Sequence, residues 1–479
     1  DFSKYFLLEP GTFYFIARLV SVFSGGLAIL VIYLISNKLY NKKIALLSSL
    51  LLCATFTFID LCHSAKQDVT MVLFLLLSFL SISLITKTGL KKYYILAGVF
   101  AGLAISEKYN AGFVVIPIIT SHYIWKSINR ESLKRPILEN NLFMAFLALG
   151  ITFVLCNPYL IVNAEGLWSG LRSLLFDYSS LKRVGIQQSS VNPYIYLVTN
   201  VLRNGFGIIL ETVVLIGLIY CIYRRKKEDL LVLSFIIPYM LVAGAMKSMA
   251  PHHLLPVVPL LVIVGSKFLY DAINWIVKDD RFKNIAIGFV PILIVSQPIY
   301  KVLSYDHLIS HKDTREVAKE WIENNIKPGS IVAVEDGTYS PALTRSKENL
   351  SKELLNAKSM GGGRAIKILL NLNEENYPKI TYDIIGIWKP NEGYFIQQWD
   401  RTAEDVLNDL KQKNVEYIIV NSYSYDRYFN DETLRNLYSE TEPRRKFYQL
   451  LKKEQTIIKN FESNMKDRPG PNIYIYQVK

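Results

Sequence analysis

Cysteine is scarce in this chain, and the motifs that depend on it are missing. The 479 residues include four cysteines, Cys53, Cys62, Cys156 and Cys221, and none of them stands in a CxxC pair. Neither a disulfide framework nor a thiolate metal site is indicated. The glycine run at 361–363 also lacks the lysine and the serine or threonine of a phosphate-binding loop. We interpret it as an ordinary flexible loop and predict no nucleotide site.

The C-terminal part of the chain, residues 305–479, has no excess of positive charge. Residues 305–479 carry 26 Lys and Arg against 26 Asp and Glu, whereas residues 1–304 carry 28 against 15. The net charge of +13 therefore belongs to the N-terminal part. The isoelectric point near 9.2 is consequently no evidence for a nucleic-acid partner, and we expect none.

Long apolar runs are frequent before residue 300 and do not recur after it. The chain is 51% apolar, with a mean hydropathy of +0.22, which is too apolar for an ordinary soluble protein. Most of these runs come close to the roughly 20 residues that a helix needs to cross a bilayer. We predict ten membrane spans, near residues 13–36, 44–62, 69–86, 93–106, 111–125, 142–162, 205–223, 230–246, 254–276 and 284–300.

Alternate loops between these spans differ in basic content. The loops 37–43, 87–92, 126–140, 224–229 and 277–283 hold 17 Lys and Arg in 41 residues, and the remaining loops hold 7 in 59. Cytoplasmic loops retain Lys and Arg because these residues resist translocation. The basic set is therefore predicted to be cytoplasmic.

The opposite side, which is the periplasm, the cell exterior or a lumen, receives the other loops and everything after residue 300. These other loops are 63–68, 107–110, 163–204 and 247–253. We place the chain in the plasma membrane as a multi-pass protein. Residues 1–12 would also begin outside without a signal-peptide pattern, so we expect a further span before Asp1.

From residue 306 onward, amphipathic helices alternate with short β-rich runs. Helices are predicted over 314–326 and 403–413, and strands over 331–334, 416–420 and 472–478. The predicted fold is a polytopic α-helical membrane domain, 1–304, followed by an extramembrane α/β domain, 305–479.

Ionisable residues gather at two predicted external turns. Asp60, His63, Lys66 and Asp68 fall within nine residues, and Lys108 lies at the other turn. Lysine offers a point charge to a lipid phosphate, and a carboxylate can bind a metal or accept a proton. This combination predicts a site for a lipid phosphate and a hydroxyl acceptor. The alternative is that these residues cap hairpin turns wetted by lipid headgroups.

Two adjacent histidines, His252 and His253, lie in a third external turn. They could act as metal ligands. The alternative, which we favour, is that they occupy an interfacial turn without a metal.

Several blocks together resemble the GT-C glycosyltransferases of the protein O-mannosyltransferase and aminoarabinose transferase type. Ala17-Arg18-Leu19-Val20-Ser21 followed by Gly25 is similar to the start of that superfamily's second membrane helix. The turn 63–68 resembles the external turn with the second conserved acidic residue of the family, and the block 98–110 resembles the one whose lysine sits near the lipid phosphate. Further similar blocks are 39–43, 251–259 and 415–425.

The resemblance implies a hexosyl or pentosyl transferase that moves a sugar from a polyprenyl-phosphate donor to an acceptor hydroxyl on a protein, lipid or glycan. It implies Asp68 as a catalytic residue, Lys66, Lys108 and His63 as substrate-binding residues, and a divalent metal in some members. The family's principal catalytic acid lies well before the block at Arg18, and Asp1 is too close to be assigned that role. The chain is then a fragment of an active enzyme or a member without activity.

Two other functions remain open from the sequence. One is a transporter or flippase of lipid-linked saccharides, which predicts inverted repeats and mid-membrane charges. The other is a non-catalytic assembly subunit whose external domain binds a partner.

Overall fold

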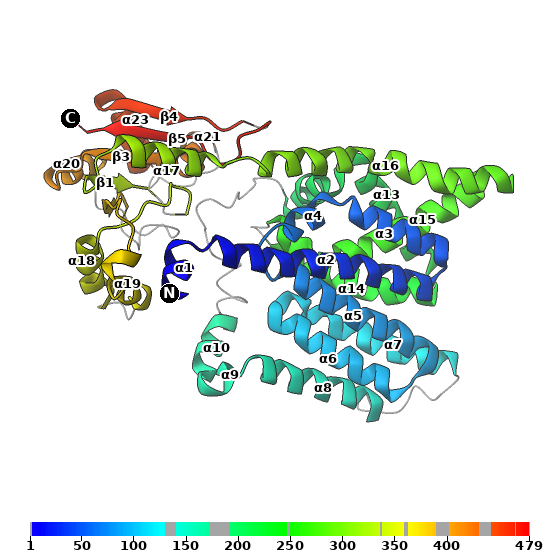
Figure 1. Cartoon of the computed structure of the whole chain (residues 1–479). Helices are drawn as coiled ribbons and strands as arrows, with labels where there is room; N and C mark the ends of the chain where they lie inside the picture. The colour runs from blue at the N-terminus through cyan, green and yellow to red at the C-terminus, as the bar shows by residue number, and fades with distance from the viewer. Residues whose placement is uncertain are drawn as a thin grey trace. The chain divides into compact units, whose positions relative to one another are not determined.

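The structure is a computed structural model and describes residues 2–129, 140–172, 192–246, 250–335, 338–358, 363–388, 402–430, 442–464 and 466–478 (Figure 1). The chain divides into two compact units. We call residues 14–180 and 191–303 the helical unit, and residues 1–13, 181–190 and 304–479 the sheet unit. Most of the predicted glycine loop, at 361–362, lies outside the described residues.

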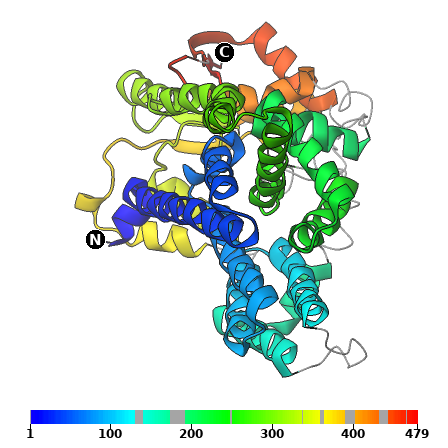
Figure 2. The same cartoon turned by 90° about the vertical axis from the view of Figure 1, so that its right-hand side faces the viewer.

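The long helices of the helical unit run roughly side by side along one direction (Figures 1 and 2). All described helical segments of this unit, short ones included, are α2 (Gly11–Leu39), α3 (Lys42–Cys53), α4 (Phe56–Cys62), α5 (Asp68–Thr88), α6 (Lys91–Glu107), η1 (Tyr109–Val114), α7 (Val115–Ile128), α8 (Asn140–Cys156), α9 (Tyr159–Val162), α10 (Ala164–Arg172), α12 (Pro193–Tyr196), η3 (Leu197–Leu202), α13 (Arg203–Arg224), α14 (Lys227–Ala245), η4 (Pro251–Leu254), α15 (Val258–Ile276) and α16 (Asp280–Ile309).

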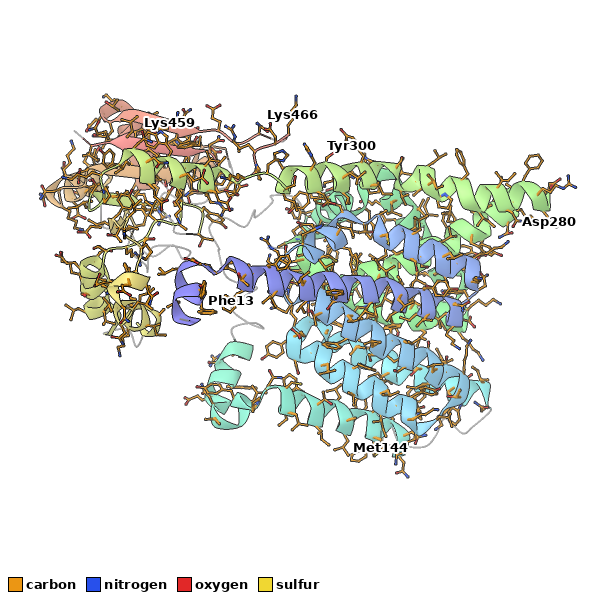
Figure 3. All side chains as sticks on the ribbon, in the orientation of Figure 1. Phe13, Met144, Asp280, Tyr300, Lys459 and Lys466 are labelled. Atoms are coloured by element: carbon orange, nitrogen blue, oxygen red, sulfur yellow. The ribbon has the colours of Figure 1, made fainter. Side chains whose placement is uncertain are left out.

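Each predicted span falls on one or more of these helices. Among the described residues, seven helical segments are long and apolar enough to cross a membrane, or eight if the bent pair α3 and α4 counts as one span. The predicted spans 93–106 and 142–162 correspond to α6 and α8, which have only 17 residues each. Large apolar side chains remain exposed on the outside of the bundle, as for Tyr300, which points away from α16 in Figure 3 and is 76% exposed. A multi-span helical membrane protein is thus confirmed.

Two of the predicted spans are broken. α3 and α4 meet at an angle of 64° around Thr55, whose hydroxyl donates to Leu51 O at 2.9 Å. α13 breaks at Gly207, whose φ of +72° favours glycine, and the freed amide of Ile208 donates to Gln297 Oε1 at 3.2 Å. Side chains therefore satisfy the backbone at the breaks, which a membrane interior requires. The prediction of a loop through residue 204 was wrong at its end, because residues 193–203 are helical and lead into α13.

Contacts join the basic loops at one end of the bundle. The Lys87 ammonium donates to Lys38 O, Asn141 donates to Gly89 O at 3.3 Å, and Lys43 donates to Asn284 Oδ1 at 2.8 Å. These contacts bring together residues in or beside four of the five predicted cytoplasmic loops. The structure therefore agrees with the alternation of the loops, while the side of the membrane on which each end lies stays a prediction.

We expect cysteine labelling to assign the two sides. A cysteine introduced at Ser64 in a cysteine-free background should react with an impermeant maleimide added from outside, and one at Lys91 should react only after the membrane is permeabilised. The physical reason is that basic loops such as 87–92 resist translocation. Labelling of the Lys91 position alone in intact cells would invert the predicted topology.

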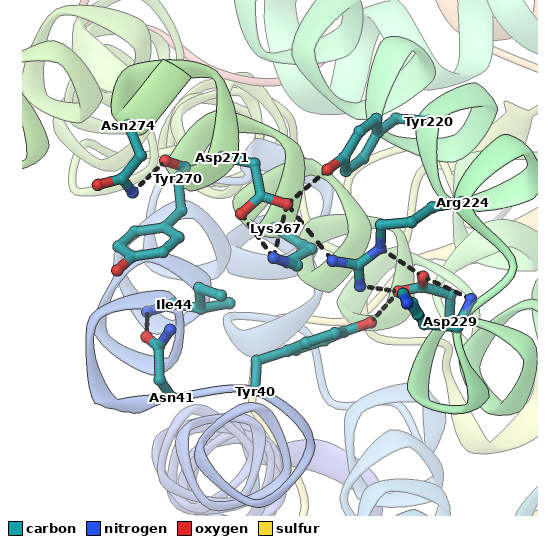
Figure 4. Close-up of polar contacts among 11 residues, drawn as sticks. Tyr40, Asn41, Ile44, Tyr220, Arg224, Asp229, Lys267, Tyr270, Asp271 and Asn274 are labelled. Atoms are coloured by element: carbon teal, nitrogen blue, oxygen red, sulfur yellow. Dashed lines mark hydrogen bonds and ion pairs between the residues drawn. The ribbon is translucent and has the colours of Figure 1, made fainter. Parts of the chain in front are cut away.

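The end of the bundle that holds the basic loops also contains a buried network of charged side chains (Figure 4). Arg224 donates to both oxygens of Asp229, at 2.7 and 2.6 Å, and the Tyr40 hydroxyl donates to Asp229 Oδ1 at 2.8 Å. Asp271 accepts from Lys267 at 2.6 Å and from Arg224 at 3.4 Å. Two cations thus balance two carboxylates and tie the ends of α2, α13, α14 and α15 together.

The sheet unit contains one mixed sheet of five strands in the order β2-β1-β3-β5-β4 (Figure 1). β1, β2 and β3 are parallel, and β5 runs antiparallel to β3 and β4. The strands are β1 (Ile331–Val334), β2 (Asp383–Gly386), β3 (Tyr417–Asn421), β4 (Thr456–Phe461) and β5 (Ile473–Gln477). The helices are α1 (Phe2–Leu8), α17 (Thr314–Asn325), α18 (Lys347–Lys358), α19 (Arg364–Leu370), η5 (Glu374–Asn376), α20 (Ala403–Gln412), α21 (Ser422–Asn430) and α23 (Glu442–Glu454).

Helices cover both faces of this sheet. Ile418 packs with Leu410 of α20 and Phe447 of α23, whereas the next residue, Ile419, packs on the other face with Ile322 of α17. This alternation follows from the period of two along a strand. The predicted α/β pattern is confirmed, although β2 and β4 were not predicted from the sequence.

Candidate active site

The turn 63–68 is held in place by α2. The Ser21 hydroxyl lies 2.8 Å from Ser64 O and 3.3 Å from Lys66 O. One helical turn further along α2, a Cβ on Gly25 would lie only 2.5 Å from Cys62 Sγ, so glycine allows α2 to approach the end of α4 closely. Ser21 and Gly25 both belong to the block that resembles the GT-C enzymes, and the structure gives them a positioning role.

Asp68 and Lys108 form an ion pair across two turns. Lys108 Nζ lies 2.7 Å from Asp68 Oδ1. Asp68 is the first residue of α5 and only 3% exposed, where the positive end of the helix dipole stabilises a carboxylate. Lys108 ends α6 and keeps 24% of its side chain exposed. Two residues that the sequence singled out independently are therefore in direct contact.

Lys66 and His63 are placed differently. Lys66 is exposed, on the same turn as Asp68. His63 is half-buried and ends α4, with Nδ1 3.1 Å from Ile59 O in its own helix. The capping contact of His63 favours the structural alternative for this residue, and its predicted role in substrate binding stays a prediction.

A cavity of about 430 Å³ opens beside this ion pair. Its polar lining includes Lys108, Asn110, Tyr239 and His253. The rest of the lining consists of Gln67, Ile105, Ser106, Glu107, Tyr109, Phe113, Val242, Ala243 and Met246. A mostly apolar cavity with a few convergent polar groups is the usual form of a small-molecule site.

A chain of hydrogen bonds crosses the cavity wall. Asn110 Nδ2 donates to the Tyr239 hydroxyl at 3.0 Å, and that hydroxyl donates to His253 O. The Phe113 ring lies edge-on to the Tyr239 ring at 5.3 Å between centroids. Tyr239 was missed in the sequence because a tyrosine inside an apolar span carries no signal of its own, and only folding brings α14 to η1 and η4.

His252 lies near the ion pair. Burial lowers the pKa of His252, the charges of Lys108 and Lys66 lower it further, and Asp68 opposes this change. Burial and the two lysines thus favour the neutral imidazole. Among the residues that the structure describes, no group of three or more His, Cys, Asp or Glu side chains could hold a metal ion. The described residues thus offer no cluster of ligands for a divalent metal, and the interfacial turn predicted for His252 and His253 stays a prediction.

The comparisons with known proteins agree with the sequence motifs. A model of the dolichyl-phosphate-mannose-protein mannosyltransferase family matches residues 11–161, which include Asp68 and Lys108. This match confirms the resemblance to GT-C enzymes that the motifs predicted. The chain is therefore similar to this family over residues 11–161, about a third of its length.

Solved structures of this type are similar to the chain at low identity. ArnT from Cupriavidus metallidurans in the apo state has a TM-score of 0.49 and 11% identity, with 96% of this chain and 83% of that chain covered. The oligosaccharyltransferase of Archaeoglobus fulgidus in the apo form has a TM-score of 0.45 and 11% identity, with 86% and 59% covered. The chain therefore spans less than two thirds of the length of the Archaeoglobus enzyme. A search among curated proteins found no match.

Proposed function

We propose that the chain transfers a sugar from a polyprenyl-phosphate donor to an acceptor hydroxyl on the external face of the plasma membrane. The observation that carries this proposal is the Asp68–Lys108 ion pair at the edge of an apolar cavity. The Lys108 ammonium suits the donor phosphate, the Asp68 carboxylate suits the proton of the acceptor hydroxyl, and the apolar lining of the cavity suits a lipid chain. Two solved structures that are similar to the chain at low identity contain ligands: ArnT from Cupriavidus metallidurans is bound to undecaprenyl phosphate, and the Archaeoglobus fulgidus oligosaccharyltransferase is tethered to an acceptor peptide.

In this mechanism the donor phosphate competes with Asp68 for Lys108. The ammonium turns to the phosphate, and the Asp68 carboxylate becomes available to the acceptor hydroxyl. The acceptor oxygen attacks the anomeric carbon while the bond from that carbon to the phosphate oxygen breaks. The polyprenyl phosphate leaves with the electron pair, Asp68 takes the proton, and the configuration inverts.

The Archaeoglobus fulgidus oligosaccharyltransferase was also solved in a complex with zinc and sulfate. The described residues of this chain do not offer three clustered metal ligands. We assign the phosphate to Lys108 because this lysine lines the cavity, with Lys66 adding positive charge from the same turn as Asp68.

We expect Lys108→Gln to act on donor binding more than on chemistry. The substitution removes the cation that faces the phosphate, and a hydrogen bond to a charged group contributes about 1.5–3 kcal/mol, so binding of undecaprenyl phosphate should weaken by about tenfold or more. The KM for the donor should rise more than kcat falls. Binding to the reconstituted chain is measured by native mass spectrometry, and KM and kcat by transfer kinetics.

Lys91→Gln is the matched control, because Lys91 is exposed at the opposite end of the bundle. It should bind undecaprenyl phosphate like the unchanged chain. Lys108→Arg should retain most of the affinity. A pure loss of kcat in Lys108→Gln, with unchanged lipid binding, would contradict the assignment of Lys108 to the phosphate. Binding of the lipid without any transfer would favour a non-catalytic subunit.

A further inference from the structure

The sheet unit has a point at which its chain topology reverses. From β1 the chain passes to β2 on one side, and the next parallel strand, β3, lies on the other side of β1. In open sheets with parallel strands, ligands bind outside the carboxyl ends of the strands at such a reversal. A ligand site is therefore expected near the carboxyl ends of β1 and β3.

A buried polar network joins these two strand ends. Glu335 follows β1 and is only 8% exposed, and its carboxylate accepts from the backbone and side-chain amides of Asn421 at 3.1 and 3.3 Å. The Tyr448 hydroxyl donates to the same carboxylate. Asn421 Nδ2 also lies 3.3 Å from the Ser340 hydroxyl. The segments after β1 and β3 are thus fixed relative to each other.

Two tyrosines and an arginine lie on the surface above this network. The rings of Tyr339 and Tyr423 stand edge to face, with centroids 5.6 Å apart and planes at 82°. Tyr423 is 52% exposed. Arg315, near the start of α17, donates to Thr338 O at 3.1 Å beside Tyr339. We call Arg315, Tyr339 and Tyr423 the tyrosine patch.

The charge of the tyrosine patch is compensated. Arg315 Nε and Nη2 each lie 2.8 Å from a different oxygen of Asp313. A bidentate arginine–carboxylate pair satisfies both groups in a fixed geometry. The patch therefore offers an exposed aromatic surface without a free cation, which favours an uncharged ligand over an anionic one.

We propose that the tyrosine patch binds a neutral oligosaccharide. The half-exposed Tyr423 ring gives an apolar surface on which one face of a pyranose ring can stack, and the Tyr339 ring, in edge-to-face contact with it, borders that surface. Aromatic side chains with a few oriented polar groups are typical of ligand sites. The site lies entirely in the sheet unit, so this binding does not depend on the transfer reaction.

The test uses the whole chain in lipid nanodiscs, because maltoside detergents would present sugars of their own. Mannotriose is the probe, and its contact with the protein is followed by saturation-transfer difference NMR. We expect saturation of the ring protons of one sugar face. Removing a central aromatic contact commonly costs a large part of the binding energy, so Tyr423→Ala should weaken binding by about tenfold or more, and Tyr423→Trp should retain it.

Leu355→Ala is the control, since Leu355 is 70% exposed elsewhere in the sheet unit and should not affect binding. Thermal melting shows whether Tyr423→Ala is folded. Asp68→Asn should leave the NMR signal unchanged, which separates this site from the cavity of the helical unit. An absent signal, or an equal signal in Tyr423→Ala, would overturn the proposal. Tighter binding of trigalacturonate than of mannotriose would overturn the assignment to a neutral ligand.

Discussion

Replacing Asp68 with asparagine is expected to lower kcat for sugar transfer by about 10²-fold or more, the range for loss of a positioned general base. The amide has nearly the same shape but cannot accept the acceptor's proton. Because Lys108 then loses its 2.7 Å partner, its ammonium is more available to the donor phosphate. Binding of undecaprenyl phosphate should therefore be unchanged or tighter, as native mass spectrometry can measure beside the transfer assay.

Asp280→Asn is the matched control for this experiment. Asp280 pairs with Lys283 at 2.9 Å, but its side chain is 93% exposed and lies at the opposite end of the bundle. It should transfer sugar at the rate of the unchanged chain. If Asp68→Asn and this control have similar turnover, Asp68 is not catalytic and the turn 63–68 has a purely structural role.

Replacing Asp229 with asparagine is expected to lower the free energy of unfolding by about 3–5 kcal/mol, the range for breaking a buried ion pair on one side. Its carboxylate is fully buried and receives two hydrogen bonds from Arg224 and one from Tyr40. The substitution leaves the Arg224 charge with a weaker partner at the meeting point of three helices. Thermal and denaturant unfolding of the purified chain would measure the loss.

The exposed Asp280–Lys283 pair again gives the comparison, because an exposed pair contributes only about 0–1 kcal/mol. Asp280→Asn should melt within a degree or two of the unchanged chain. Equal melting temperatures of the Asp229 and Asp280 variants would show that the buried network adds no net stability.

The sequence predicted the architecture well where one physical signal dominates. Apolar runs and basic loops located the helices of the helical unit, because a membrane permits few other arrangements. The breaks at Thr55 and Gly207 were not predicted. Thr55 is preceded by a mostly apolar run without proline or glycine, so no local residue marks the break.

The candidate site was predicted in part. Asp68 and Lys108 carried a signal because ionisable residues cluster at these two predicted external turns. Their contact joins residues 40 positions apart, and no local pattern specifies it. Asn110 and Tyr239 were missed for the same reason, since their hydrogen bond links η1 to α14 only in the folded chain. β2 was missed because its four residues, Asp-Ile-Ile-Gly, begin and end with poor strand formers, whereas the equally short β1 reads Ile-Val-Ala-Val.

The lengths of α6 and α8 have a consequence for the surrounding lipid. Both helices have 17 residues, so each is about 25 Å long, against a hydrocarbon core of about 30 Å. They pack closely, since a Cβ on Gly98 of α6 would lie 2.0 Å from Ala145 O of α8. A short pair of this kind creates hydrophobic mismatch, which a bilayer relieves by thinning locally. Lys108 stands at the end of α6, so thinning beside this pair draws the lipid headgroups inward toward its ammonium.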